Sequence, residues 1–132
     1  MVAAPEVKTM EYHLTIHGRM ANLNDYISAE RTNRYKGAHM KEKNQKLVIA
    51  EIMDQIRHVH IKKPVMMAYR WYEKDRRRDL DNISSFGRKV IQDALVESGV
   101  LADDGWKHIK GFSDEFYVDP CNPRIEVTIT EL

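Results

Sequence analysis

A chain of 132 residues is long enough for one domain with its own hydrophobic core. Its hydrophobic share of 42% and charged share of 31% are ordinary for a globular protein, and a net charge of +1 excludes a protein that is basic over its whole surface. The single cysteine, Cys121, excludes an internal disulfide and a cysteine-based zinc site, which fits a reducing cytoplasm.

The sequence predicts no membrane segment. Residues 1–10 lack the long apolar core of a signal peptide, and no apolar run is long enough to cross a bilayer. We therefore expect a cytoplasmic protein with no membrane partner.

The first part of the chain, up to Gly37, predicts a strand and a helix. Apolar residues alternate with polar ones from Lys8 to His17, which is typical of a half-buried strand. The polar segment 19–36 predicts a loop that leads into a helix with Asn24 or Asp25 as its N-cap. We expect Gly37 to break this helix.

The middle of the chain predicts two helices around a strand. Apolar residues recur every three or four positions from Ala38 to about His58 and again from about Asn82 to Glu97, where Ser98-Gly99 forms the stop. Between them, alternation from Val65 to Tyr72 predicts a strand. Three of its residues are expected in the core, with an edge-strand dimer interface as the alternative: Met66, Met67 and Tyr69.

The C-terminal part predicts strands. Residues 106–118 indicate a strand pair or one strand bent around Gly111, and residues 124–132 indicate a closing strand. The order β-α-α-β-α-β-β favours an α+β fold in a single domain spanning residues 1–132, with about three helices packed on a mixed sheet.

The most informative stretch reads Arg76-Arg77-Arg78-Asp79-Leu80-Asp81-Asn82. Carboxylates hold hard divalent cations such as Mg²⁺. Asp79 and Asp81 can share an ion if the backbone there is extended and the helix begins after Asp81, because residues two apart on a helix point about 200° apart. The alternative is that both aspartates only cap the helix and offset its dipole.

A second acidic pair, Asp103-Asp104, follows the helix predicted from Asn82 to Glu97. A helix of some sixteen residues spans about 24 Å, so the connection must double back to bring Asp104 near Asp81. The alternative is a site shared across a two-fold dimer. Lys89 on the helix is either a residue that offsets charge near a metal or an ordinary exposed lysine.

Basic residues gather in two regions despite the balanced total charge. Guanidinium groups match phosphate oxygens, so the arginines before Asp79 predict phosphate contacts, with balancing of nearby acids as the alternative. For the lysines of segment 41–46, a solvated helical face and a DNA-binding patch are equally favoured. The residues expected to bind DNA are Asn24, Arg31, Arg34, Lys36, Arg76, Arg77 and Arg78.

The chain resembles the RusA family of Holliday-junction resolvases. The resemblance is specific from Arg76 to Asp104 and continues to the C-terminus, but before residue 60 it rests only on Asn24 and the basic loop after it. The motifs that carry it are Asp79-Leu80-Asp81-Asn82, Asp93-Ala94-Leu95, Gly99, Asp103-Asp104 and the ending from Arg124.

The resemblance implies a homodimeric, cytoplasmic, often phage-derived endonuclease that cuts four-way DNA junctions with Mg²⁺ or Mn²⁺ in recombination and repair. It implies that Asp79, Asp81 and Asp104 are catalytic metal ligands, with Asp103 as the alternative to Asp104. The essential lysine of the family falls near Ser85 when counted from Asp81, and on Lys89 when counted back from Asp93. We assign it to Lys89, so that the helix carries about one extra turn.

Two other functions stay open. A junction-binding protein of the same fold with weak or lost cleavage would bind but not cut. A metal-dependent phosphoesterase acting on small substrates would fit the near-neutral charge and would show little salt dependence.

Overall fold

The computed structural model describes residues 9–20 and 22–132. It is a single α+β domain, and its element order confirms the predicted one. The predicted start of the first strand at Lys8 lies outside the described residues. The elements are β1 (Glu11–His17), α1 (Leu23–Thr32), α2 (Arg34–Gln55), β2 (Val65–Glu73), α3 (Leu80–Glu97), β3 (Ile109–Val118) and β4 (Arg124–Glu131).

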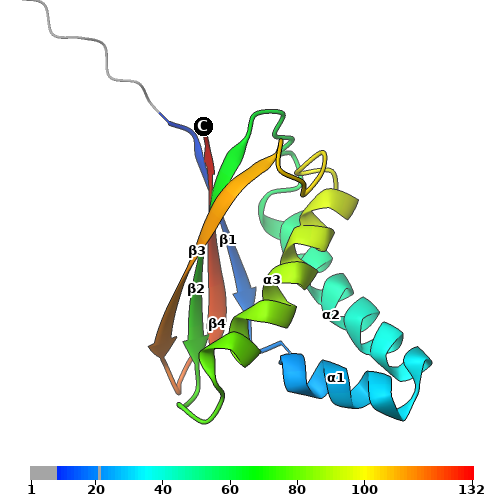
Figure 1. Cartoon of the computed structure of the whole chain (residues 1–132). Coiled ribbons are helices and arrows are strands. Elements are labelled where there is room, and N and C mark those ends of the chain that lie inside the picture. Colours follow the sequence, from blue (N-terminus) through cyan, green and yellow to red (C-terminus); the bar gives the residue numbers. More distant parts are fainter. Residues whose placement is uncertain (1–8, 21) are drawn as a thin grey trace, which may run out of the picture.

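The four strands form one mixed sheet in the order β1-β4-β2-β3. β4 pairs antiparallel with both neighbours, whereas β2 and β3 are parallel. A parallel pair needs a long crossover, which α3 provides. Figure 1 shows the three helices together on one face of the sheet. No helix of the described residues is long and apolar enough to span a bilayer.

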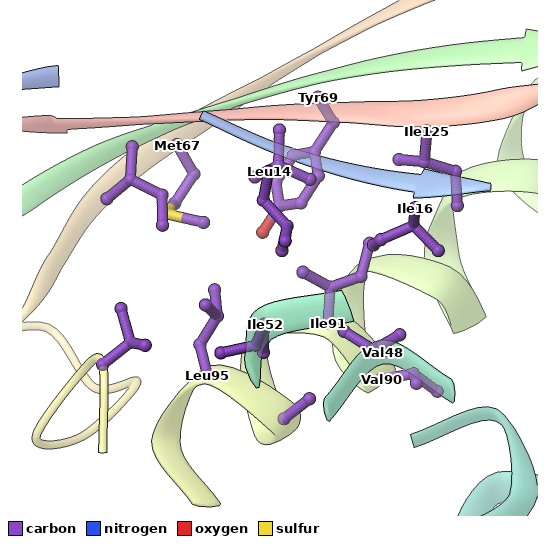
Figure 2. Close-up of a cluster of buried hydrophobic side chains, with 14 of the residues drawn as sticks. Leu14, Ile16, Val48, Ile52, Met67, Tyr69, Val90, Ile91, Leu95 and Ile125 are labelled. Carbon is purple, nitrogen blue, oxygen red and sulfur yellow. The ribbon is translucent and has the colours of Figure 1, made fainter. Parts of the chain in front are cut away.

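The core lies between this face and the helices (Figure 2). Strand residues that alternate inward meet the apolar stripes of α2 and α3, as the periodicities predicted. Met67 and Tyr69 are each only 1% exposed, so their assignment to the core is confirmed. Met66 lies on the other face of β2 and is 40% exposed, so its assignment to the core was wrong. β2 is an internal strand, so its interpretation as an edge strand was wrong.

The boundary between the first two helices differs from the prediction. Asn22 caps α1, with Asp25 in a reciprocal capping box, in place of Asn24 or Asp25. Asn33 then ends α1 and caps α2. Gly37 does not break a helix but lies inside α2. The position requires a glycine because a Cβ there would stand 2.2 Å from Cγ of Glu30 on α1.

α3 begins at Leu80, so the expectation that the helix starts after Asp81 was wrong. Its predicted stop is confirmed: the helix ends at Glu97, and Gly99 has a positive φ of 82°. Residues 109–118 form one strand, so the alternative of a strand pair was wrong. Its register against β2 shifts between Val65 and Met66, beside Gly111.

The free edge of β1 is covered near its C-terminal end by side chains of α2. The Thr15 N–H donates to Oε1 of Gln55 at 2.8 Å, and Nε2 of Gln55 donates to the Thr15 carbonyl at 2.7 Å. The His17 N–H donates to Oε2 of Glu51 at 3.0 Å. β3 is the other edge of the sheet.

Candidate active site

Asp79 and Asp81 lie where the chain leaves the 74–79 loop and enters α3. Asp79 has the predicted extended backbone (φ −66°, ψ 149°) but is itself the N-cap residue, and Asp81 lies in the first helical turn. Because only Asp81 is helical, the separation of about 200° between two helical residues does not apply to this pair, and a shared ion stays compatible with the observed start of the helix at Leu80. Both residues are exposed. The helix N-terminus places the positive end of its dipole near both carboxylates.

The Asp79 side chain makes no capping hydrogen bond to the helix. A residue retained only as a cap would accept a hydrogen bond from an N–H of the first turn. Among the described residues, neither Asp79 nor Asp81 has a side-chain hydrogen bond or an ion pair. Their carboxylate oxygens are therefore available to an external cation or donor.

Arg78, the last of the three arginines, is anchored inside the protein. Its Nη1 lies 3.3 Å from Oε1 of Glu73, and its Nη2 donates to the Met20 carbonyl at 3.0 Å. Glu73 is itself 7% exposed and also pairs with Arg19 at 3.4 Å. Burial lowers the pKa of the Arg78 guanidinium below its ordinary value, and Glu73 opposes this. Arg78 thus fixes the loop that carries Asp79.

Arg76 and Arg77 remain at the surface. Arg77 is 87% exposed and only loosely paired with Asp75 at 3.7 Å, and Arg76 has no ion pair with any described residue. A groove of about 680 Å³ brings Arg76, Arg78 and Asp79 together. A phosphate in this groove would contact the guanidinium of Arg76 beside the Asp79 carboxylate.

Asp104 lies in a second cluster, built on Lys89. Nζ of Lys89 is 3.3 Å from Oδ2 of Asp104 and 3.0 Å from Oδ1 of Asp93. Lys41 of α2 contacts the other oxygen of Asp93 at 3.0 Å. The structure thus brings the predicted Lys89 and Asp104 together, and adds Asp93 and Lys41.

These contacts fix the charges of the cluster. The hydrogen bond to Asp93 raises the pKa of Lys89 above its ordinary value; partial burial opposes this, and the contact with Asp104 adds to it. Burial acts to raise the pKa of Asp93, but the hydrogen bonds from Lys89 and Lys41 outweigh it, so that the pKa is lowered. Lys89 is therefore a cation and Asp93 an anion at neutral pH.

The two clusters are not joined within one chain. Lys89 lies eight positions after Asp81, about 12 Å along the helix axis. The connection that carries Asp104 lies at the end of the sheet opposite the start of α3 (Figure 1). In the described part of the chain, no three acidic, histidine or cysteine side chains are close enough to hold a metal. Asp79, Asp81 and Asp104 do not form one ligand set here.

A basic strip leads from α2 toward the 74–79 loop. One groove, of about 640 Å³, is lined by the cationic side chains of Arg19, Lys36 and Lys43, with His39, and contains no acid. Arg19 also lines an adjacent groove with Lys74 and Arg77. Lys36 was predicted from the sequence as a DNA-binding residue, whereas Arg19 and Lys74 were not.

The other predicted DNA-binding residues lie around the junction of α1 and α2. Arg31 is in the last turn of α1, and Arg34 is the first residue of α2, with its guanidinium 5.7 Å from the Tyr35 ring centroid. Both are exposed, as is Asn24 near the start of α1. None of these three residues lines the groove with Lys36.

Sequence reasoning missed Asp114, which lines the groove beside Asp79. It accepts hydrogen bonds from Nε1 of Trp71 at 2.9 Å and from Nη1 of Arg88 at 2.6 Å. Its partners come from β2 and α3, so no local pattern marks it. The Lys89–Asp93 pair, in contrast, has the four-residue helical spacing that could have been read from the sequence.

Comparison with known proteins gives one clear match. The family model described as endodeoxyribonuclease RusA matches residues 5–130, nearly the whole chain. No protein among those with curated descriptions matches.

Proposed function

The chain belongs to the RusA family of junction-resolving endodeoxyribonucleases, and we propose that it nicks four-way DNA junctions by metal-dependent phosphodiester hydrolysis. The nicks would fall symmetrically on opposing arms, in DNA recombination and repair. The cation would be Mg²⁺, with Mn²⁺ as a substitute, and the protein would act as a homodimer in the cytoplasm, within a phage-derived pathway.

The observation that carries this proposal is the pair of carboxylates at the start of α3. Asp79 and Asp81 have no hydrogen-bond or ion-pair partner in the described structure, and Asp79 does not cap its helix through its side chain. Hard divalent cations prefer such oxygen ligands. A bound cation would polarise the phosphoryl oxygen and lower the pKa of a water molecule.

The surrounding residues would bind and position the substrate. Arg76 would hold a phosphate in the groove beside Asp79, and Arg78 keeps the loop in place from behind. The strip of Arg19, Lys36 and Lys43 would follow the DNA backbone without reading its sequence. Lys89 would offset negative charge that develops in the transition state.

A second copy of the chain would complete the site. Asp104 is paired with Lys89 and stands apart from Asp79 and Asp81. A two-fold dimer can place Asp104 of one copy beside the aspartates of the other. Such a dimer also presents two sites related by symmetry, which suits paired nicks.

The test uses a synthetic four-way junction labelled on each strand in turn, with Mg²⁺ or with EDTA. We expect symmetric nicks from the wild type only with metal. Asp81→Asn should lose cutting but keep junction binding nearly unchanged. Asp75→Asn, on the same loop, is the matched control and should keep most of its cutting activity.

The same assay separates the alternatives. Tight binding without nicks in Mg²⁺ or Mn²⁺ would leave a junction-binding protein. Neither binding nor nicking would contradict the proposal and favour a phosphoesterase of small substrates. Junction binding should also weaken steeply as salt rises, because phosphate contacts release counterions.

A further inference from the structure

Trp106 is the most exposed large apolar residue of the described chain. Its exposed fraction is 93%, whereas the other tryptophan, Trp71, is 2% exposed in the core. Tryptophan is usually highly buried, because its ring has a large apolar surface. The proposed hydrolysis gives Trp106 no role.

The backbone that carries this side chain is held in a defined turn. The N–H groups of His108 and Ile109 both donate to the Gly105 carbonyl at 3.0 Å. The Asp104 N–H donates to Oδ1 of Asp103 at 2.8 Å. Trp106 therefore projects from a fixed position, two residues after Asp104.

The ring borders a groove of about 350 Å³ that also reaches Asp104, Lys110 and Phe112. Phe112 is 50% exposed, and the guanidinium of Arg88 stands 4.2 Å from its ring centroid. Lys107 and Lys110 are exposed, and neither forms an ion pair with another described residue. Two exposed aromatic rings thus lie among uncommitted positive charges beside a carboxylate.

We propose that Trp106 stacks on a base of the junction, next to the phosphate at the proposed metal site to which Asp104 contributes. A nucleotide offers a flat ring to the indole and a phosphate to the lysines. An apolar surface on a protein partner would satisfy the indole but would leave Lys107 and Lys110 without counter-charges. Bases at a branch point suit this role because their regular stacking is interrupted. The inference rests on the proposed function and specifies a subsite of it.

The experiment measures binding in the Asp81→Asn background, with 2-aminopurine placed at each branch-point position of a four-way junction. Trp106→Phe keeps an aromatic face and Trp106→Leu keeps only apolar bulk. We expect Leu to weaken junction binding about 5- to 100-fold and to abolish quenching of one 2-aminopurine. Phe should retain quenching and bind within about threefold of tryptophan. The variants should differ much less in their affinity for a linear duplex of equal length.

Equal junction binding and equal quenching by the Leu variant would overturn the stacking role. So would a change of sedimentation coefficient in Trp106→Leu without any change in quenching, which would assign Trp106 to an interface between copies. Thermal melting checks that each variant is folded. Nicking by the chain with Asp81 intact is measured in parallel: its absence would refute the proposed function itself, whereas normal nicking with an unaffected Leu variant would refute the stacking role alone.

Discussion

At the scale of single residues, Lys89 is the proposed charge-offsetting group. Its ammonium is shared between Asp93 and Asp104, and the hydrogen bond to Asp93 raises its pKa. Because this pKa lies above the ordinary lysine value of about 10.4, Lys89 stays protonated from pH 6 to 9, and cleavage in that range should show no titration of this residue. The stability that the raised pKa contributes is likewise fully present below about 10.4 and is lost as pH rises through the folded-state pKa.

Replacing Lys89 by methionine should lower the cleavage rate about 100-fold, because a positive charge near the reacting phosphate is lost. Junction binding should change little. The free energy of unfolding should fall by at most about 1 kcal/mol, since the ion pairs are partly exposed. Single-turnover cleavage and urea unfolding measure the two effects.

Lys41→Met is the matched control for this prediction. Lys41 contacts the same Asp93 but not Asp104. If Lys41→Met lost as much cleavage as Lys89→Met, the two lysines would only support Asp93, and the assignment of Lys89 to catalysis would be wrong.

At the scale of elements, α3 approaches the sheet through Gly87. A Cβ at this position would stand 2.8 Å from Cζ3 of Trp71 and 3.1 Å from Cε of Met20. Any side chain there would push α3 away from β2. Because Asp79 and Asp81 are carried by the start of the same helix, this contact also helps to position the proposed site.

Gly87→Ala should destabilise the protein by roughly 1–2 kcal/mol, since overpacking costs more than the gain in helix propensity. It should also reduce cleavage, because the start of α3 shifts. Ser85→Ala on the same helix should leave both nearly unchanged. Urea midpoints and nicking rates of the two variants and the wild type measure these effects. A Gly87→Ala variant more stable than the wild type would contradict the packing argument.

Periodicity predicted which segments are helices and strands, but not how closely they pack. The boundary between the first two helices lies at Asn33 and not at the predicted Gly37. Gly37 instead permits α2 to approach Glu30, a contact between helices that no single-segment pattern reveals. The start of α3 was displaced by two residues because ligand geometry, and not helix capping, guided the prediction.

At the scale of the whole molecule, the two acidic clusters lie at different positions along α3. The sequence marked both, because Asp79-Leu80-Asp81 and Asp103-Asp104 are local motifs. Their separation in one chain depends on where the connection after α3 runs, which the sequence left open. Arg19 was likewise unpredictable, because its partner Glu73 belongs to a distant strand.

A site shared between copies predicts complementation. Asp81→Asn and Asp104→Asn should each be inactive alone, because every site of a homodimer then lacks a ligand. A mixed dimer would combine the intact Asp81 of one copy with the intact Asp104 of the other. We expect such mixtures, after dissociation and reassociation, to recover nicking at one site per dimer.

Junctions labelled on opposite strands measure this recovery. Single nicks without paired ones would support the shared site. A mixture that stays inactive, although exchange of subunits is shown by differently tagged chains, would mean that each chain supplies its own complete ligand set.

The side chains of Gln55 and Glu51, which are hydrogen-bonded to the edge of β1, affect how readily molecules associate through their sheet edges. A strand from another molecule cannot pair with Thr15 or with the His17 N–H of β1, since these backbone groups are already bonded to α2. β3 is the other edge of the sheet. Fibre growth by strand addition needs both edges of every molecule to be open, so the partial cover of β1 by α2 disfavours repeated addition.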